Sequence, residues 1–254
     1  MVLDEFRPLT VKAGDAQIAD NQRIRVQGSK NMTLFPDFFQ VEIYNMTDED
    51  LASLTDSQIV SVYGEEGGLI CTGKLDDMYT KQNGANITTT ISVVDGQDFW
   101  RSKVVKTLAG NSSVKTAYQN IIQNAKIGAF TAEDKKIIRG QTYCGRLADC
   151  VSMLAKSVNG RAYITNGTVF VTTKGMSAEI VSLSDSDVIL DQDTAEGALI
   201  VKTSVKGYPV GALVEIGNAK YRLVSQKFDA DNFEGAWDTY LILINEALFE
   251  LEGG

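Results

Sequence analysis

The chain has 254 residues, of which 44% are hydrophobic and 22% charged, with 24 Lys and Arg against 33 Asp and Glu. This composition is typical of a globular protein, and the length fits one large domain or two to three small ones. The absence of histidine excludes Ser-His-Asp and Cys-His catalysis and every histidine-ligated zinc site. The net charge of −9 argues against nucleic acid as a bulk partner, because phosphate binding needs a basic surface.

The three cysteines, Cys71, Cys144 and Cys150, include no Cys-x-x-Cys pair. The first residues lack a basic region followed by an apolar stretch, so no signal peptide is predicted, and the apolar runs are too short to span a bilayer. We therefore expect synthesis in a reducing cytoplasm, with free thiols and no membrane insertion. Cys144 and Cys150 are expected to be buried as small hydrophobic residues.

Residues 1–98 read as a β unit of short strands. The segments are rich in β-branched residues, several alternate with period two, and Gly, Asn and Asp clusters separate them. A short helical turn is expected over 48–54. The predicted strands cover residues 23–26, 39–44, 59–63, 69–72 and 87–94.

Residues 99–176 switch to a helical pattern and are predicted to form a small α+β domain of three helices and a β-hairpin. The first helix is expected over 98–108, ending before Gly110. The second follows a Ser112 or Ser113 cap, and the third covers about 145–158. Asn166-Gly167 predicts the turn of a hairpin over 163–171.

Residues 177–254 return to strands, predicted over 179–183, 199–203, 213–216, 221–224 and 239–244. The order of elements resembles that of the first unit: a strand, a Gly-containing turn, a strand, a Lys-apolar-Asp triplet (74–76 and 227–229), a polar loop, Gly-Ala, and a long strand. We interpret this as a weak internal repeat. The alternative is two unrelated antiparallel meanders.

The charge follows the same division. Residues 1–100 carry a net charge of −9, residues 101–176 carry +9 from 12 basic and 3 acidic side chains, and residues 177–254 carry −9. Either the middle segment presents a basic surface to a partner, or its lysines are a chance cluster on solvated helices.

Several motifs suggest chemistry but have a simpler reading. Residues 68–74 match the start of a phosphate-binding loop, but Leu75 replaces the Ser or Thr that would hold Mg²⁺, and the segment reads as a strand. The acids around residues 229–235 lack the spacing of a Ca²⁺ loop and are expected in a solvated hairpin loop, and those at 185–193 read as exposed loop. The adjacent pairs 65–66 and 76–77 would point to opposite faces of a strand. No catalytic, cofactor-binding or metal-binding residue is predicted.

The aromatic residues Phe35, Phe38, Phe39, Phe99, Trp100 and Trp237 are mostly expected in the core. The run over 35–39 could equally anchor a subunit contact, because aromatic side chains are enriched in interfaces.

Two segments resemble the tailed-phage baseplate hub family, which is related to hub parts of contractile injection systems. The strand Phe39-Gln40-Val41-Glu42-Ile43-Tyr44-Asn45-Met46 is similar to that family's "IYN" strand, and Val93-Val94-Asp95-Gly96 fits the strand end before the helices. Residues 211–216, 221–224 and Gly235-Ala236-Trp237-Asp238-Thr239 are similar to its closing "G-x-W-x-T" hairpin. Residues 227–229 depart from the family, which often has a histidine there.

The resemblance implies a fold of two tail-tube-like β-barrel domains, 1–98 and 177–254, flanking the α+β domain 99–176. It implies a structural, non-enzymatic hub: a homotrimeric, pseudo-sixfold ring that joins the hexameric tail tube to the trimeric central spike in the virion baseplate. The tube protein, the spike and other baseplate proteins would be its partners. DNA would only pass through, along an acidic lumen that repels phosphate.

Two other classes of function stay open. The chain could be another tail-tube, distal-tail or injection-system structural protein, which would form a sixfold ring. It could also be a carboxylate-dependent cell-wall hydrolase, which would need a cleft with two acids about 5–10 Å apart.

Overall fold

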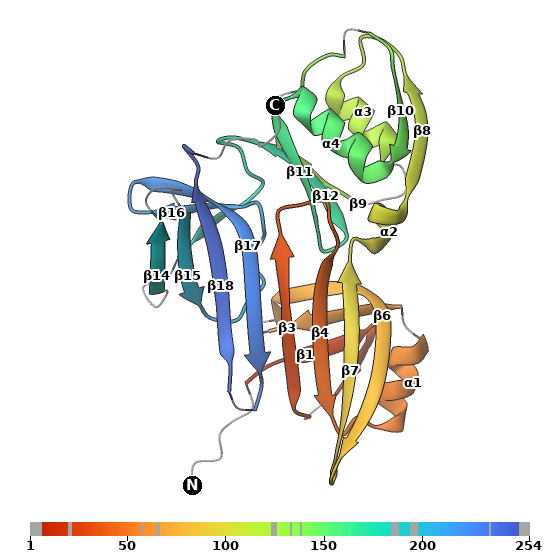
Figure 1. Cartoon of the computed structure of the whole chain (residues 1–254), viewed down its shortest axis with the longest axis vertical. Coiled ribbons are helices and arrows are strands. Elements are labelled where there is room, and N and C mark those ends of the chain that lie inside the picture. Colours follow the sequence, from red (N-terminus) through yellow and green to blue (C-terminus); the bar gives the residue numbers. More distant parts are fainter. Residues whose placement is uncertain are drawn as a thin grey trace.

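A computed structural model of the protein describes residues 7–19, 22–56, 58–64, 67–122, 126–132, 134–137, 139–183, 188–193, 198–233 and 235–248. Strands predominate, as the sequence predicts, and one sheet of 13 strands contains most of them. The strands of this sheet come from the two outer segments of the chain. Figure 1 shows the helices α2, α3 and α4 of the middle segment at one end of the molecule.

The part of the first segment that the structure describes forms seven strands and one helix, and the strands follow from apolar residues that alternate along the chain. On β4, Phe39, Val41 and Ile43 are buried while Phe38 points to solvent, as expected for a strand with one face on the core. The elements are β1 (Thr10–Ala13), β2 (Ala16–Ile18), β3 (Ile24–Asn31), β4 (Asp37–Tyr44), α1 (Asp48–Asp56), β5 (Ile59–Tyr63), β6 (Leu69–Asn83) and β7 (Asn86–Asp95).

The described residues of the middle segment form three helices and two small sheets. Ser113 caps α3 by accepting a hydrogen bond from the Thr116 N–H at 3.1 Å, and Asn166 and Gly167 turn the predicted hairpin with positive φ. The elements are α2 (Gln97–Arg101), β8 (Lys103–Leu108), α3 (Val114–Ile121), β9 (Lys126–Phe130), β10 (Gln141–Arg146), α4 (Leu147–Ser157), β11 (Gly160–Thr165) and β12 (Thr168–Thr173).

The helix expected over 98–108 is wrong in its second half. The helix α2 ends at Arg101, and residues 103–108 form β8, which pairs antiparallel with β10. The β-branched Val104 and Val105 favour a strand, and the partner strand lies more than 30 residues further along the chain. A local pattern therefore could not reveal this pairing.

Within its described ranges, the last segment adds six strands: β13 (Ile180–Ser182), β14 (Val188–Asp193), β15 (Ala198–Thr203), β16 (Leu213–Ile216), β17 (Ala219–Asp231) and β18 (Trp237–Asn245). The strand predicted over 221–224 is in fact the 13-residue β17. Lys227-Phe228-Asp229 lies within that strand, where Phe228 is buried.

The apolar core crosses between the outer segments. The first hydrophobic cluster is built mainly on residues 9–93, and it includes Val205, Phe228 and Ala230 of the last segment. A second cluster lies within residues 99–171, and a third joins β15, β16, β17 and β18. The outer segments are therefore packed on each other by shared apolar burial.

Candidate assembly interface

The two outer segments each contain the same arrangement of five antiparallel strands. In the first β unit the order is β3-β4-β7-β6-β5, and in the second β unit it is β14-β15-β18-β17-β16. All neighbouring pairs in both units are antiparallel. The repeat suggested by the sequence is thus present in the strand order.

A β-bulge (an extra residue in one strand of a pair) fixes how the two units correspond. The register of β6 against β7 shifts between Leu75 and Asp77, and the register of β17 against β18 shifts between Leu223 and Ser225. Because bulges are specific local features of a strand pair, Leu75 corresponds to Leu223. The Lys-apolar-Asp triplets on which the sequence repeat was aligned are therefore not equivalent.

Within the chain, the two β units are joined strand to strand. Residues 225–231 of β17 pair antiparallel with residues 25–31 of β3. Arg23, which immediately precedes β3, donates to Asp231 at 2.7 Å, and Arg25 of β3 donates to Asp229 at 3.1 Å. Basic side chains at and just before β3 thus face the acids of β17. Asp231 is buried, so its interaction with Arg23 is screened less by solvent than that of the more exposed Arg25 and Asp229 pair.

Aromatic packing reinforces this joint. The Phe39 and Phe228 rings stack with centroids 5.7 Å apart. Gly28 passes between them, and a Cβ there would lie 2.6 Å from Phe39 Cδ1 and 2.9 Å from the carbonyl oxygen of Phe38. The position therefore requires glycine for close approach.

The strand edges equivalent to this joint are open in the described chain. The strand β5 pairs with β6 only as far as Lys74, so the same edge of residues 77–83 carries no strand, and β14 ends the sheet with β15 as its only neighbour. By the correspondence above, residues 77–83 of β6 match the part of β17 that pairs with β3, and β14 matches β3. The edge of β6 at residues 77–83 and the outer edge of β14 thus both remain without a partner strand among the described residues.

Buried ionisable groups lie where β3, β4 and β7 meet the hairpin of the middle segment. Lys30, Asp37 and Asp95 are each less than 4% exposed. Burial raises the pKa of the Asp37 carboxyl to about 7, raises the pKa of Asp95 and lowers that of the Lys30 ammonium group. Asn31 donates to Asp37 from its side chain at 3.0 Å, and the Gly167 N–H donates to Asp95 at 2.6 Å. The cluster ties the middle segment to the first β unit.

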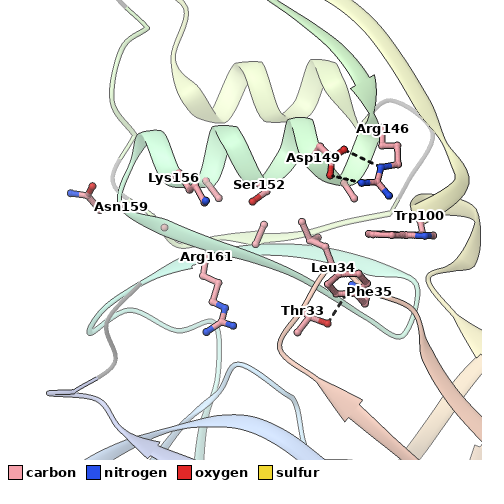
Figure 2. A pocket seen from close by; sticks show the side chains of 14 residues that line it. Thr33, Leu34, Phe35, Trp100, Arg146, Asp149, Ser152, Lys156, Asn159 and Arg161 are labelled. Carbon is pink, nitrogen blue, oxygen red and sulfur yellow. Dashed lines mark hydrogen bonds and ion pairs between the residues drawn. The ribbon is translucent and has the colours of Figure 1, made fainter. Parts of the chain in front are cut away.

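A groove of about 440 Å³ lies between α4, β11 and the loop that follows β3. Figure 2 shows Asp149, Ser152 and Lys156 along the helix side and Trp100 at one end. The Trp100 ring contacts Phe35 at a centroid distance of 4.7 Å, and the Arg146 guanidinium lies 4.8 Å from its centre. Phe35 is 61% exposed and therefore lies outside the core, while the alternative that it anchors a subunit contact stays a prediction.

Of the other aromatic and cysteine residues expected in the core, some are buried and others are exposed. Phe39 and Phe99 are buried, Trp100 and Trp237 are partly buried, and Phe38 is 65% exposed. Cys150 is buried as expected, but Cys144 lies on β10 and is exposed, because it follows the buried Tyr143 on an alternating strand.

The described acidic residues that were expected in loops lie in strands. Asp229 and Asp231 belong to β17 and bind arginines, so the exposed loop expected there is wrong, and Asp191 and Asp193 lie in β14. Sequence reasoning missed this ionic contact, although acids at period two on one strand and Arg23 and Arg25 at period two on another were visible. Residues 65, 66, 185, 187 and 234 lie outside the described residues.

The phosphate-loop match at 68–74 lies almost entirely in β6, as predicted, and not at a strand-to-helix turn. No group of three or more potential metal ligands is brought together within the described ranges. In the part of the chain that the structure covers, every helix is too short or too polar to cross a bilayer.

No protein-family model matches the chain, and no curated protein matches it. Solved structures share its fold. The tail protein from Neisseria meningitidis MC58 has a TM-score of 0.63 and 12% identity over 94% of this chain and 96% of that one. The 43 kDa tail protein of prophage MuSo2 from Shewanella oneidensis has a TM-score of 0.65 and 11% identity over 94% and 98%.

The E. coli c3393 protein has a TM-score of 0.63 and 8% identity over 94% of this chain and 76% of that one. It is described as a component of the type VI secretion system with structural similarity to the T4 tail proteins gp27 and gp5. The chain therefore has the fold of phage tail proteins, and the resemblance predicted from its sequence is confirmed at the level of the fold.

Proposed function

We propose that this chain is a structural baseplate hub protein without catalytic activity, of which three copies close into a pseudo-sixfold ring. The ring joins the hexameric tail tube to the trimeric spike and surrounds the channel through which DNA leaves. Residues 1–98 and 177–254 are its two barrel-like domains, and residues 99–176 are the domain between them.

The observation that carries this proposal is the pair of open edges. Inside one chain, β17 of the second unit already pairs with β3 of the first. If the same contact between β units forms between two copies of the chain, residues 77–83 of β6 in one copy pair with β14 of the next copy. Such a head-to-tail contact uses two different surfaces and closes into a ring when the rotation permits. Two units per chain give six units in three copies.

The charge distribution supports the same arrangement. The outer segments each carry −9 and the middle segment +9. In the ring, acidic outer segments line the channel and repel the DNA phosphates, while the middle segment faces other baseplate proteins on the outside. A ring in which lysines and arginines of residues 101–176 line the channel would contradict this assignment.

The mass of the assembled species tests the proposal. Native mass spectrometry at increasing protein concentration, with and without a tail-tube protein, should give a species of three times 27.7 kDa, alone or within a larger complex. A closed sixfold species would instead indicate a tube or distal-tail protein. Peptidoglycan cleavage by the purified chain would indicate the hydrolase.

A further inference from the structure

The strand β8 has an open edge. Among the described residues it pairs with β10 alone, and Figure 1 shows it at the margin of the middle segment. The Leu147 N–H donates to the Ser102 carbonyl at 2.9 Å, which extends the ladder between the two strands by one pair. Because hydrogen-bonded and non-hydrogen-bonded pairs alternate along an antiparallel ladder, three residues of β8 point their backbone groups away from β10: Lys103, Val105 and Thr107.

Two observations support this assignment of the edge. The hydroxyl oxygens of Thr107 and Thr142 lie 3.0 Å apart, as expected for a non-hydrogen-bonded pair, in which side chains approach more closely. No described residue makes a backbone hydrogen bond to the outward groups of Lys103, Val105 or Thr107. All three residues are exposed, and Val105 is 76% exposed. The edge is therefore accessible to a further strand, for which such a row of unpaired groups is a template.

The side chains at this edge are basic. Arg101, Lys103 and Lys106 form no ion pair with a described residue, and each is exposed or partly exposed. Lys103 and Lys106 lie three positions apart on the strand and hence on opposite faces, so an added strand meets positive charge on both faces. The whole segment 101–176 carries 12 basic and 3 acidic residues, which gives a long-range field of the same sign. The charge therefore selects a strand that carries Asp or Glu.

The same charges disfavour other pairings. Two copies of β8 joined at this edge would bring their lysines side by side, and like charges across a strand pair are destabilising. The outer edge of β10 is the other open edge of this small sheet among the described residues. Its basic side chain, Arg146, is already held by Asp149 at 3.0 Å. An acidic strand is thus attracted more strongly to β8 than to β10.

We propose that β8 binds an extended acidic segment of another baseplate polypeptide by strand addition, with an apolar residue of that segment packed on Val105. The proposal rests on the proposed function for the source of the partner, because it requires the middle segment to face other baseplate proteins. The site lies away from β6 and β14, so its binding can be measured whether or not the ring closes.

A library of random peptides of about twelve residues, long enough to contain one strand, is selected on the full chain. We expect enrichment of sequences in which Asp or Glu alternate with β-branched or aromatic residues. A synthetic peptide of the most enriched sequence should shift the amide resonances of Lys103, Val105 and Thr107 and slow their exchange with solvent. Enrichment of basic sequences, shifts confined to other surfaces, or tighter binding of a single-stranded DNA oligonucleotide at this edge would overturn the proposal. So would a dimer of the peptide-free chain that shows the same slowed amides.

A proline substitution separates strand addition from simple charge attraction. Val105→Pro removes an outward N–H at a position where an edge strand tolerates proline. It should weaken the peptide about tenfold, as the loss of one backbone hydrogen bond does, at unchanged thermal unfolding. Cys144→Pro is the matched control, because Cys144 lies directly opposite Val105 and its N–H points to the outer edge of β10. Equal binding by the folded Val105→Pro variant would overturn the proposal.

Charge variants test the choice of an acidic partner. Lys103→Glu with Lys106→Glu should shift selection toward basic peptides, whereas the same charge change on α3 and α4, Lys115→Glu with Lys156→Glu, should not. Unchanged selection by the first pair would overturn the proposal. If Val105→Pro does not fold, amide exchange decides, because strand addition must slow the three outward amides and charge attraction leaves them unchanged.

The outcomes for the ring and for this edge are distinguishable. A peptide bound at β8 by a chain that never forms the three-copy species would contradict the ring alone. The three-copy species without any peptide bound at β8 would contradict strand addition alone.

Discussion

The guanidinium of Arg222 lies against the carboxylate of Glu246, with Nε 3.0 Å from Oε2, and both side chains are buried. The same guanidinium donates to the carbonyl oxygens of Met176 at 2.9 Å and Gly211 at 2.8 Å. One side chain of β17 therefore holds together the end of the middle segment, the loop before β16 and the residue after β18. Removing it leaves several buried acceptors without a donor.

We expect Arg222→Met to destabilise the chain by about 3–5 kcal/mol, because it leaves a buried carboxylate unpaired. Glu246→Gln keeps a hydrogen-bond acceptor and removes only the charge, so it should cost less. Urea unfolding followed by fluorescence measures both. Equal losses in the two variants would contradict this account of the ion pair.

The contact between the outer segments depends on Gly207. A Cβ there would lie 1.6 Å from the carbonyl oxygen of Leu69, and backbone cannot yield as a side chain can. Gly207→Ala should lower the free energy of unfolding by about 1–3 kcal/mol or more. Gly64→Ala is the matched control, since its Cβ would mainly meet the Ile70 side chain at 3.2 Å. If Gly64→Ala lowered the free energy of unfolding as much as Gly207→Ala, crowding against the backbone would not explain the effect at Gly207.

The ionic contact at the joint should be measurable by a double-mutant cycle. The Asp231 side chain is 5% exposed and accepts from Arg23 Nη2 at 2.7 Å. We expect Arg23→Gln and Asp231→Asn to couple by about 1–3 kcal/mol. The more exposed pair Arg25 and Asp229 should couple by about 1 kcal/mol or less. The reverse ranking would show that burial does not govern the joint.

The stability of the chain should fall as the pH rises toward 8 because of Asp37. Its pKa is raised from an unfolded value of about 3.9 to about 7 by burial. The folded chain therefore binds more protons between these values, and this contribution is full below about pH 4 and lost as the pH rises through 7. Lys30 and Asp95 face the same cluster, so Asp37→Asn should reduce the slope without abolishing it.

Urea unfolding at pH 5 and pH 8 checks this slope. The control Asp15→Asn changes an exposed carboxyl in a turn and should keep the slope of the unchanged chain. If Asp37→Asn also keeps it, the titration of Asp37 does not contribute.

The sequence correctly predicted those strands, turns and helices that depend on patterns among neighbouring residues. The strand at 39–44, the Asn166-Gly167 hairpin and the helix α4 are confirmed, because alternation, turn chemistry and an apolar stripe each act within about ten residues. It missed β8 because its partner β10 is distant, and it shortened β17 because the polar residues after Val224 read as a loop.

The joint between the β units could be predicted only in outline. The weak repeat indicated two similar units, but nothing local pairs residue 26 with residue 230, about 200 positions away. The register follows from contacts between distant residues that no local pattern reveals: the stacked Phe39 and Phe228, and the acids of β17 facing Arg23 and Arg25. The groove was likewise hidden, although the exposed aromatic run had suggested a contact surface.

A cysteine cross-link between copies tests the central claim most directly. Ala230 lies opposite Val26 in the joint within one chain, and the corresponding positions on the open edges are Gln82 and Ile189. In a chain carrying Cys144→Ser, the pair Gln82→Cys and Ile189→Cys should oxidise to cross-linked species that end at three copies, whereas either change alone should form no such series. Only monomer after oxidation, under conditions where the three-copy mass is present, would contradict the ring built on β6 and β14.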